Sequence, residues 1–134
     1  MTSRTYNQIG ENPWSLPEGS SFGQFVPGFS VDAAIPYGEE GRLIQLTQRD
    51  AASLDGFRTN LGLVNATGAI LDLKLDLYRA DGTWLATKQG DELRLPPYGF
   101  RQLDQAFAPW GPLADAYVVV RPMTPGGRLF AFAT

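Results

Sequence analysis

The stretch that decides the fold of this chain is Ala69-Ile-Leu-Asp-Leu-Lys-Leu-Asp-Leu-Tyr78. Its leucines alternate with Asp72, Lys74 and Asp76. A period of two places successive side chains on opposite faces, as in a β-strand with one face in a core and the other in water. Such strands are typical of antiparallel sheets, because the strands of parallel sheets are usually apolar on both faces. The stretch therefore predicts an antiparallel all-β domain, with the leucines inside and the charged side chains solvated.

The residues that follow predict a β-hairpin. We expect a three-residue loop, Ala80-Asp81-Gly82, because it places Gly82 in the left-handed region after a type I turn. This loop pairs Leu77 with Leu85 on the buried face. On the outer face it places Tyr78 opposite Trp84, and the two aromatic side chains point away from the core.

Other strand signals follow at short intervals. The expected strands cover residues 42–48, 57–65, 69–79, 83–88, 92–95, 100–103, 114–122 and 128–133. The 15 glycines and 10 prolines agree with the many turns that such strands need. The pattern predicts an antiparallel immunoglobulin-like β-sandwich of seven to nine strands. A small closed barrel is the alternative.

The length of 134 residues predicts a single domain, in which we expect two parts. Residues 42–134 are the sandwich core, and residues 1–41 combine a strand at 2–7 with an irregular arm. The arm is rich in glycine and proline but also carries many large apolar residues, such as Trp14, Phe22 and Phe25. Leaving each of these in water would forgo about 1.5–3 kcal/mol, so we expect the arm to pack on a sheet face. A flexible tether is the alternative.

Composition excludes several classes of function. The formal net charge is −3, whereas nucleic-acid binding needs clustered cations. The chain has no cysteine and no histidine, which removes disulfides, thiol chemistry, the usual zinc ligands and the commonest general base. No run of 18 apolar residues is present to span a membrane. We expect no catalytic residue, no cofactor and no metal. A carboxylate-pair enzyme and an oxygen-ligated calcium site are the alternatives considered.

Aromatic residues are the remaining candidates for a binding site. Trp84 and Tyr78 come first because the hairpin register aims them outward, and Trp110 comes second because Pro109 and Pro112 flank it in an expected loop. Together they would form a stacking platform for sugar rings. The alternative is that these aromatics are core and arm-packing residues.

Three segments resemble an immunoglobulin-like module that recurs in secreted and cell-surface proteins of bacteria. They are Phe57-Arg-Thr-Asn-Leu-Gly-Leu-Val-Asn65, Leu77-Tyr-Arg-Ala-Asp-Gly82 and Leu95-Pro-Pro-Tyr-Gly-Phe-Arg-Gln102. The resemblance covers residues 42–134. It implies export, and it implies a generally non-catalytic spacer, adhesin or docking unit, for which no catalytic residue is defined. Fold-level analogy carries little information about function.

The expected function is therefore that of a non-enzymatic, extracellular structural or adhesive β-sandwich module of a larger secreted protein. A carbohydrate-binding module is the alternative. The expected partners are other domains of the parent protein or extracellular ligands, with no nucleic acid. The first six residues lack an apolar signal core. We expect a secreted or cell-surface location, which implies a leader that this chain does not contain, and a cytoplasmic location is the alternative. Because residues 2–7 form a lone terminal strand, we also expect weak strand-mediated self-association.

Overall fold

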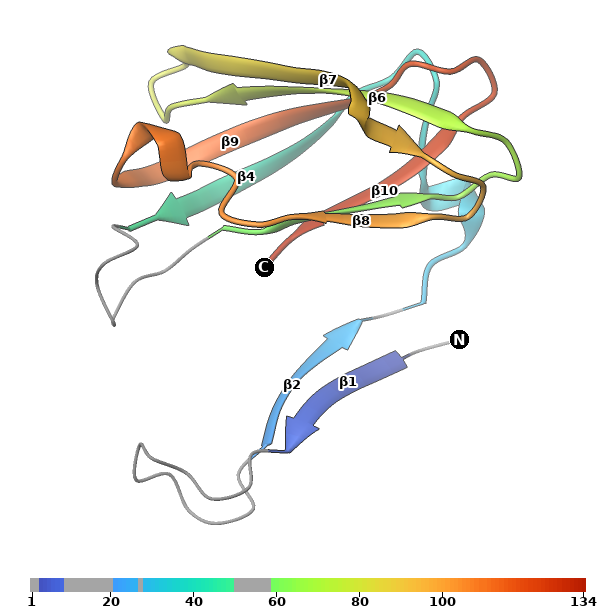
Figure 1. The fold of residues 1–134 in the computed structure, drawn as a ribbon, viewed down its shortest axis with the longest axis horizontal. Coiled ribbons are helices and arrows are strands. Elements are labelled where there is room, and N and C mark those ends of the chain that lie inside the picture. Colours follow the sequence, from blue (N-terminus) through green and yellow to red (C-terminus); the bar gives the residue numbers. More distant parts are fainter. Residues whose placement is uncertain (1–2, 9–20, 27, 50–58) are drawn as a thin grey trace. The chain divides into compact units, whose positions relative to one another are not determined.

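The computed structural model describes residues 3–8, 21–26, 28–49 and 59–134 (Figure 1). The chain divides into two compact units, Met1–Ala33 and Ala34–Thr134, and each is considered by itself.

The first unit contains a two-stranded antiparallel sheet. β1 (Ser3–Gln8) pairs with β2 (Ser21–Val26) along all six residues, and a short 3-10 helix, η1 (Val31–Ala33), follows. β2 corrects the expectation of an irregular arm, since the stretch lacks the alternation that would have indicated a strand. The side chains of Trp14, Phe22 and Phe25 lie outside the described part, and packing of the arm on a sheet face stays a prediction.

The second unit consists of two four-stranded sheets (Figure 1). The β10 sheet contains, in spatial order, β3 (Ile35–Pro36), β10 (Arg128–Ala133), β5 (Leu61–Asn65) and β8 (Phe100–Leu103). The β6 sheet contains β4 (Gly41–Gln48), β9 (Leu113–Pro122), β6 (Leu71–Tyr78) and β7 (Trp84–Leu95). All described strand pairs are antiparallel. The prediction of an antiparallel β-sandwich of seven to nine strands is confirmed.

The order of the strands adds a correction to the expected topology. The eight strands pair the first with the last, the second with the seventh, the third with the sixth and the fourth with the fifth: β3–β10, β4–β9, β5–β8 and β6–β7. This nested order is that of a jelly roll. It differs from the immunoglobulin order, in which the first and second strands are neighbours. Turn signals in the sequence locate strands but do not reveal which distant strands meet.

Two expected boundaries also differ. Ile35 and Pro36, assigned to the arm, form β3 and pair with Leu129 and Arg128 of β10. The expected strands at 83–88 and 92–95 are one strand, β7. The ladder between β6 and β7 is irregular between Asp72 and Lys74, and Gly90 there has φ +94°. Glycine adopts this backbone conformation without a steric penalty, so the strand continues past an interruption that resembles a turn.

The core lies between the sheets. The four leucines of β6 are at most 1% exposed, and burying each contributes about 1.5–3 kcal/mol. The alternating pattern that predicted this strand is therefore confirmed for its buried face. The other largest fully buried side chains are those of Phe107, Leu61, Leu63, Leu93, Leu95, Leu129, Val118 and Val120.

The hairpin between β6 and β7 confirms one half of the expected register. Gly82 has φ +85°, and Tyr78 lies opposite Trp84, as predicted. Leu77, however, lies opposite Ala86 rather than Leu85, because the register shifts by one residue between Leu77 and Tyr78. The shift places Thr87 opposite Asp76 on the outer face, where their side chains hydrogen-bond. A polar contact on the outer face thus accompanies the bulge that turn geometry alone did not predict.

Candidate ligand-binding face

The outer face of the β6 sheet carries a row of three aromatic residues, Trp84, Tyr78 and Tyr117, on neighbouring strands β7, β6 and β9. We call these three residues the aromatic row. The rings of Tyr78 and Tyr117 stack, with centroids 4.8 Å apart and planes 9° from parallel. Trp84 is 59% exposed and lies at the open end of the row. An exposed indole beside two stacked rings is a candidate surface for a flat, partly apolar ligand.

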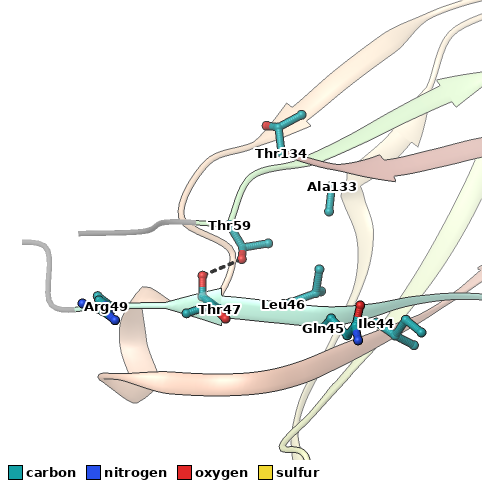
Figure 2. A pocket seen from close by; sticks show the side chains of 8 residues that line it. All are labelled: Ile44, Gln45, Leu46, Thr47, Arg49, Thr59, Ala133 and Thr134. Carbon is teal, nitrogen blue, oxygen red and sulfur yellow. Dashed lines mark hydrogen bonds between the residues drawn. The ribbon is translucent and has the colours of Figure 1, made fainter. Parts of the chain in front are cut away.

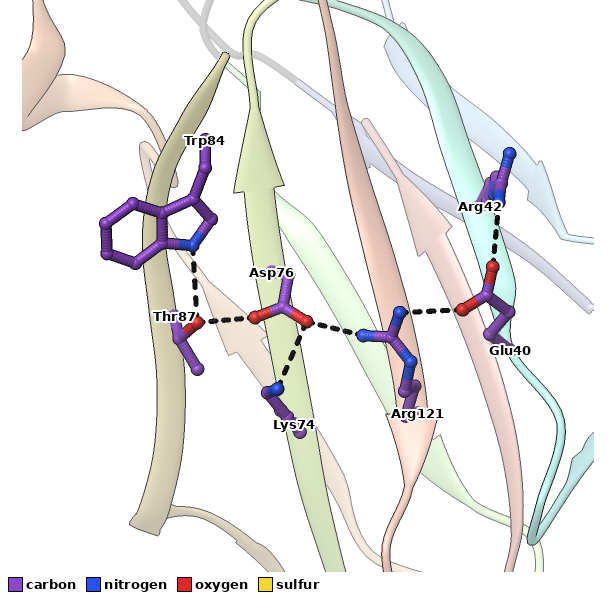
Figure 3. A network of polar contacts seen from close by, with 7 residues as sticks. All are labelled: Glu40, Arg42, Lys74, Asp76, Trp84, Thr87 and Arg121. Atoms are coloured by element: carbon purple, nitrogen blue, oxygen red, sulfur yellow. Dashed lines mark hydrogen bonds and ion pairs between the residues drawn. The ribbon is translucent and has the colours of Figure 1, made fainter. Parts of the chain in front are cut away.

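A network of polar and charged side chains crosses the same face and reaches Trp84 (Figure 3). It consists of Glu40, Arg42, Lys74, Asp76, Thr87 and Arg121, and we call it the polar network. The Trp84 indole N–H donates to Thr87 Oγ1 at 3.4 Å, and the Thr87 hydroxyl donates to Asp76 Oδ1 at 2.5 Å. The Trp84 indole therefore contacts the polar network through one hydrogen bond, to Thr87.

Asp76 is the centre of the polar network. Arg121 Nη1 donates to its Oδ2 at 2.5 Å, and Lys74 Nζ lies 3.4 Å from the same oxygen. Arg121 also donates from Nη2 to Glu40 Oε2 at 2.7 Å, and Glu40 accepts a second bond from Arg42. Asp76 is only 5% exposed, which corrects the expectation that every charged side chain of this strand is solvated. Alternation predicts which side chains point outward, but neighbouring long side chains can cover an outward-pointing carboxylate.

Both carboxylates of the polar network stay ionised at neutral pH. Burial raises the pKa of Asp76, but hydrogen bonds from Thr87 and Arg121 and the charge of Lys74 outweigh it and leave this pKa below its ordinary value. Hydrogen bonds from Arg42 and Arg121 lower the pKa of Glu40. Neither group has the raised pKa that a general acid needs at neutral pH. The arrangement is suited to holding a ligand through ionised and hydroxyl groups.

The three aromatic residues singled out from the sequence do not form one platform. Tyr78 and Trp84 are cross-strand neighbours, but Tyr78 stacks on Tyr117. Trp110 belongs to a short 3-10 helix, η2 (Ala108–Trp110), and is partly buried against the core. Its ring packs edge-on against that of Phe107, with the ring centroids 6.4 Å apart. The flanking prolines indicated a loop that would present Trp110, whereas one turn of helix instead packs it inward.

Sequence reasoning missed Tyr117, Thr87, Arg121 and Glu40. Tyr117 follows from the period of β9 once β9 is known to be the neighbour of β6. Arg121 lies opposite Lys74, and only that pairing reveals why two cations face one another beside Asp76. Glu40 precedes β4 and is 81 positions from Arg121, so no local pattern could have linked them.

The structure also contains a pocket of about 560 Å³ between β4 and the end of β10 (Figure 2). The lining residues are Ile44, Gln45, Leu46, Thr47, Arg49, Thr59, Ala133 and Thr134. The Thr59 hydroxyl donates to the Thr47 carbonyl at 2.8 Å and connects β4 to the segment before β5. Gln45 has φ +58° at an irregularity of the β4–β9 ladder, so β4 bends beside the pocket.

Within the described ranges, no three histidine, cysteine, aspartate or glutamate residues lie close enough to hold a metal ion. The described residues also contain no helix of the length and hydropathy needed to cross a bilayer.

Comparison with known proteins supports the fold. No protein-family model matches the chain, and a search of the curated proteins finds no match. Among solved structures, the chain is similar to the Anabaena sensory rhodopsin transducer, with a TM-score of 0.51 and 10% sequence identity. The match covers 71% of this chain and 84% of that chain. At this identity, the likeness shows the fold alone.

Proposed function

We propose that the chain is a non-catalytic binding module that holds a glycan on the outer face of the β6 sheet. The observation that carries the proposal is the exposed Trp84 ring, tied through Thr87 to the ionised Asp76. Exposed single aromatics are common on protein surfaces. Here, however, the exposed ring lies beside the stacked pair Tyr78 and Tyr117 and beside the polar network.

The chemistry of this surface fits a sugar. A pyranose ring has faces made of C–H groups, which pack on an indole, and hydroxyl groups at its rim, which hydrogen-bond to carboxylates and guanidinium groups. The aromatic row would take the C–H face, and the polar network would take hydroxyl groups. A module that faces extracellular glycans also requires the exported location expected from the sequence, and that location is part of the proposal.

The test is binding to neutral polysaccharides in affinity gel electrophoresis, with β-glucan, xylan and mannan as probes. We expect at least one of them to retard the chain. We expect Trp84→Ala to weaken that binding about tenfold, which corresponds to about 1.4 kcal/mol. Phe100→Ala is the matched control, because Phe100 is also exposed but lies in the β10 sheet. Retardation of Trp84→Ala equal to that of the unaltered chain would remove Trp84 from the site.

A second candidate function is that of a structural or adhesive unit that binds protein. One observation favours it. Phe100 is 56% exposed on the outer face of the β10 sheet, and its ring stacks with that of Phe132, with the ring centroids 6.2 Å apart. Exposed apolar patches often mark protein contacts. Beads coated with the chain would then adhere to the producing cells through Phe100. Loss of adhesion in Phe100→Asp, but not in Trp84→Ala, would favour this function over glycan binding.

A further inference from the structure

Beside Ala131 and Ala133, no described strand pairs with the second edge of β10. β5 pairs with β10 from Leu129 to Ala133, whereas β3 pairs only with Arg128 and Leu129. Thr134 and Asn60 exchange both backbone hydrogen bonds, at 2.9 and 3.0 Å. Because hydrogen-bonded and non-hydrogen-bonded pairs alternate in an antiparallel ladder, the backbone groups of Ala131 and Ala133 point away from β5. No described strand occupies the edge toward which they point.

The path of the chain before β3 explains this open edge. Ile35 lies opposite Leu129, so an extension of β3 in the same register would place Ala33 opposite Ala131 and Val31 opposite Ala133. Instead, Val31–Ala33 form η1, in which the Ala33 N–H donates to the Ser30 carbonyl at 3.0 Å. The backbone therefore leaves the extended conformation where the ladder would have continued.

The pocket beside β4 adjoins the same edge. Ala133 and Thr134 line it on one side, and Ile44 and Leu46 of β4 line it on the other (Figure 2). In an antiparallel pair, directly opposite residues project to the same face. A strand added along Ala131 and Ala133 would therefore point its side chain opposite Ala133 toward this pocket. Strand addition to a sheet edge next to side-chain pockets is a recurrent way to bind an extended segment.

The first unit of the chain supplies segments of this kind. β1 and β2 form a two-stranded sheet of their own, and each strand has one outer edge without a described neighbour. A two-stranded hairpin alone is marginally stable in water, so it gains by adding to a larger sheet. We propose that the β1–β2 hairpin of one copy adds to the β10 edge of a second copy. Reciprocal addition gives a two-fold dimer, and the outer face of the β6 sheet remains free for a ligand.

The absence of cysteine allows a direct test by cross-linking. One preparation carries Thr5→Cys in β1 and another carries Thr134→Cys beside β10, and the two are refolded together and treated with a flexible bis-maleimide. We expect a covalent dimer that contains one chain of each kind. A third preparation carries both changes in one chain. The proposal is overturned if the mixture gives no mixed dimer, or if this double variant cross-links only within single chains.

Sedimentation velocity tests the role of the open edge. At about 100 µM, a dimer with a dissociation constant in the micromolar range is mostly formed. We therefore expect the full chain to sediment as a dimer at this concentration. Ala133→Pro removes the N–H that points to the open edge and leaves the β5 ladder its donors, so we expect a monomer with unchanged circular dichroism. Ala133→Gly keeps this N–H and should remain a dimer. Two results would contradict the proposed strand addition: an unaltered chain that sediments as a monomer, or an Ala133→Pro variant that folds and remains a dimer. If Ala133→Pro does not fold, the cross-linking result decides whether the hairpin adds to the β10 edge.

Discussion

On the outer face of the β6 sheet, Asp76, Arg121 and Glu40 join residues of neighbouring strands through charged hydrogen bonds, and Trp84 stands exposed at one side. On the outer face of the β10 sheet, Phe132 lies over Gly62 and stacks with Phe100. Both faces carry stacked aromatic rings, but only the face of the β6 sheet adds a network of ion pairs that joins its strands. The comparison teaches that alternation along a strand defines an outward face without defining how polar or how exposed that face is.

The largest effect that would test this comparison is expected from Asp76→Ala. The change leaves Arg121 with Glu40 as its remaining carboxylate partner and leaves the Thr87 hydroxyl without its acceptor. We expect the free energy of unfolding to fall by about 2–3 kcal/mol, less than for a fully buried pair, because Arg121 is partly exposed. Urea unfolding measures this change. Asp72→Ala is the control, since its ion pair with Arg94 is exposed and should contribute less than about 1 kcal/mol. Equal losses for the two variants would mean that the polar network stabilises no more than an ordinary surface pair.

Acid should weaken the same face selectively. The pKa values of Asp76 and Glu40 are lowered on folding from ordinary values of 3.8 and 4.5. Their stabilising contribution is therefore complete above these ordinary values and is lost as pH falls toward and through the folded-state values. We expect the stability difference between the unaltered chain and Asp76→Asn to shrink as pH falls through 3.8 and below, and to stay constant between pH 6 and 8, in urea titrations at fixed ionic strength. A difference that grows in acid would reverse the assigned direction of the pKa shift.

On the outer face of the β10 sheet, Gly62→Ala should produce an intermediate loss of stability. A Cβ atom at Gly62 would clash with the Phe132 ring, so the ring has to move away from its stack with Phe100. We expect a loss of about 1 kcal/mol, at the low end for an overpacked site, because the ring is the end of a flexible side chain. In a double-mutant cycle with Phe132→Leu, the two losses should not be additive. Additive losses would place the strain in the backbone of β5 instead.

The smallest effect is expected from Trp84→Ala, at most about 0.5 kcal/mol in stability, since the indole is mostly exposed. Phe100→Ala should cost about 1 kcal/mol because it removes a stacked ring. Thermal unfolding of both variants measures the two stability losses. A larger loss for Trp84→Ala than for Phe100→Ala would show that Trp84 serves the fold more than a ligand.

The sequence predicted most of the strands because their signals are local. Four alternating leucines specify β6, and Asp81-Gly82 specifies the turn that places Tyr78 opposite Trp84. The nested strand order was not predictable, because it depends on pairings such as Ile35 with Leu129, which no local pattern links. β2 was missed for another reason: Gly23 and the apolar pair Phe25 and Val26 interrupt the alternation.

The candidate site was predictable only in part. Hairpin geometry led to Trp84 and Tyr78, whereas Trp110 was misjudged because prolines indicate the end of regular structure but not the direction of a side chain. The burial of Asp76 depends on Arg121 and Thr87, which reach it from two different strands. A carboxylate that is charged and covered can be recognised only when its neighbours across the sheet are known.

The nested pairing has a consequence for how quickly the sandwich forms. β10 is the last of its strands along the chain, yet it lies between β3 and β5, and Leu129 meets Ile35, which is 94 positions earlier. Until β10 is in place, β3 has no partner in its sheet and β5 has only β8. Contacts this distant along the chain are slow to form, so folding on a scale of milliseconds to seconds is expected, with β6 and β7 free to associate early.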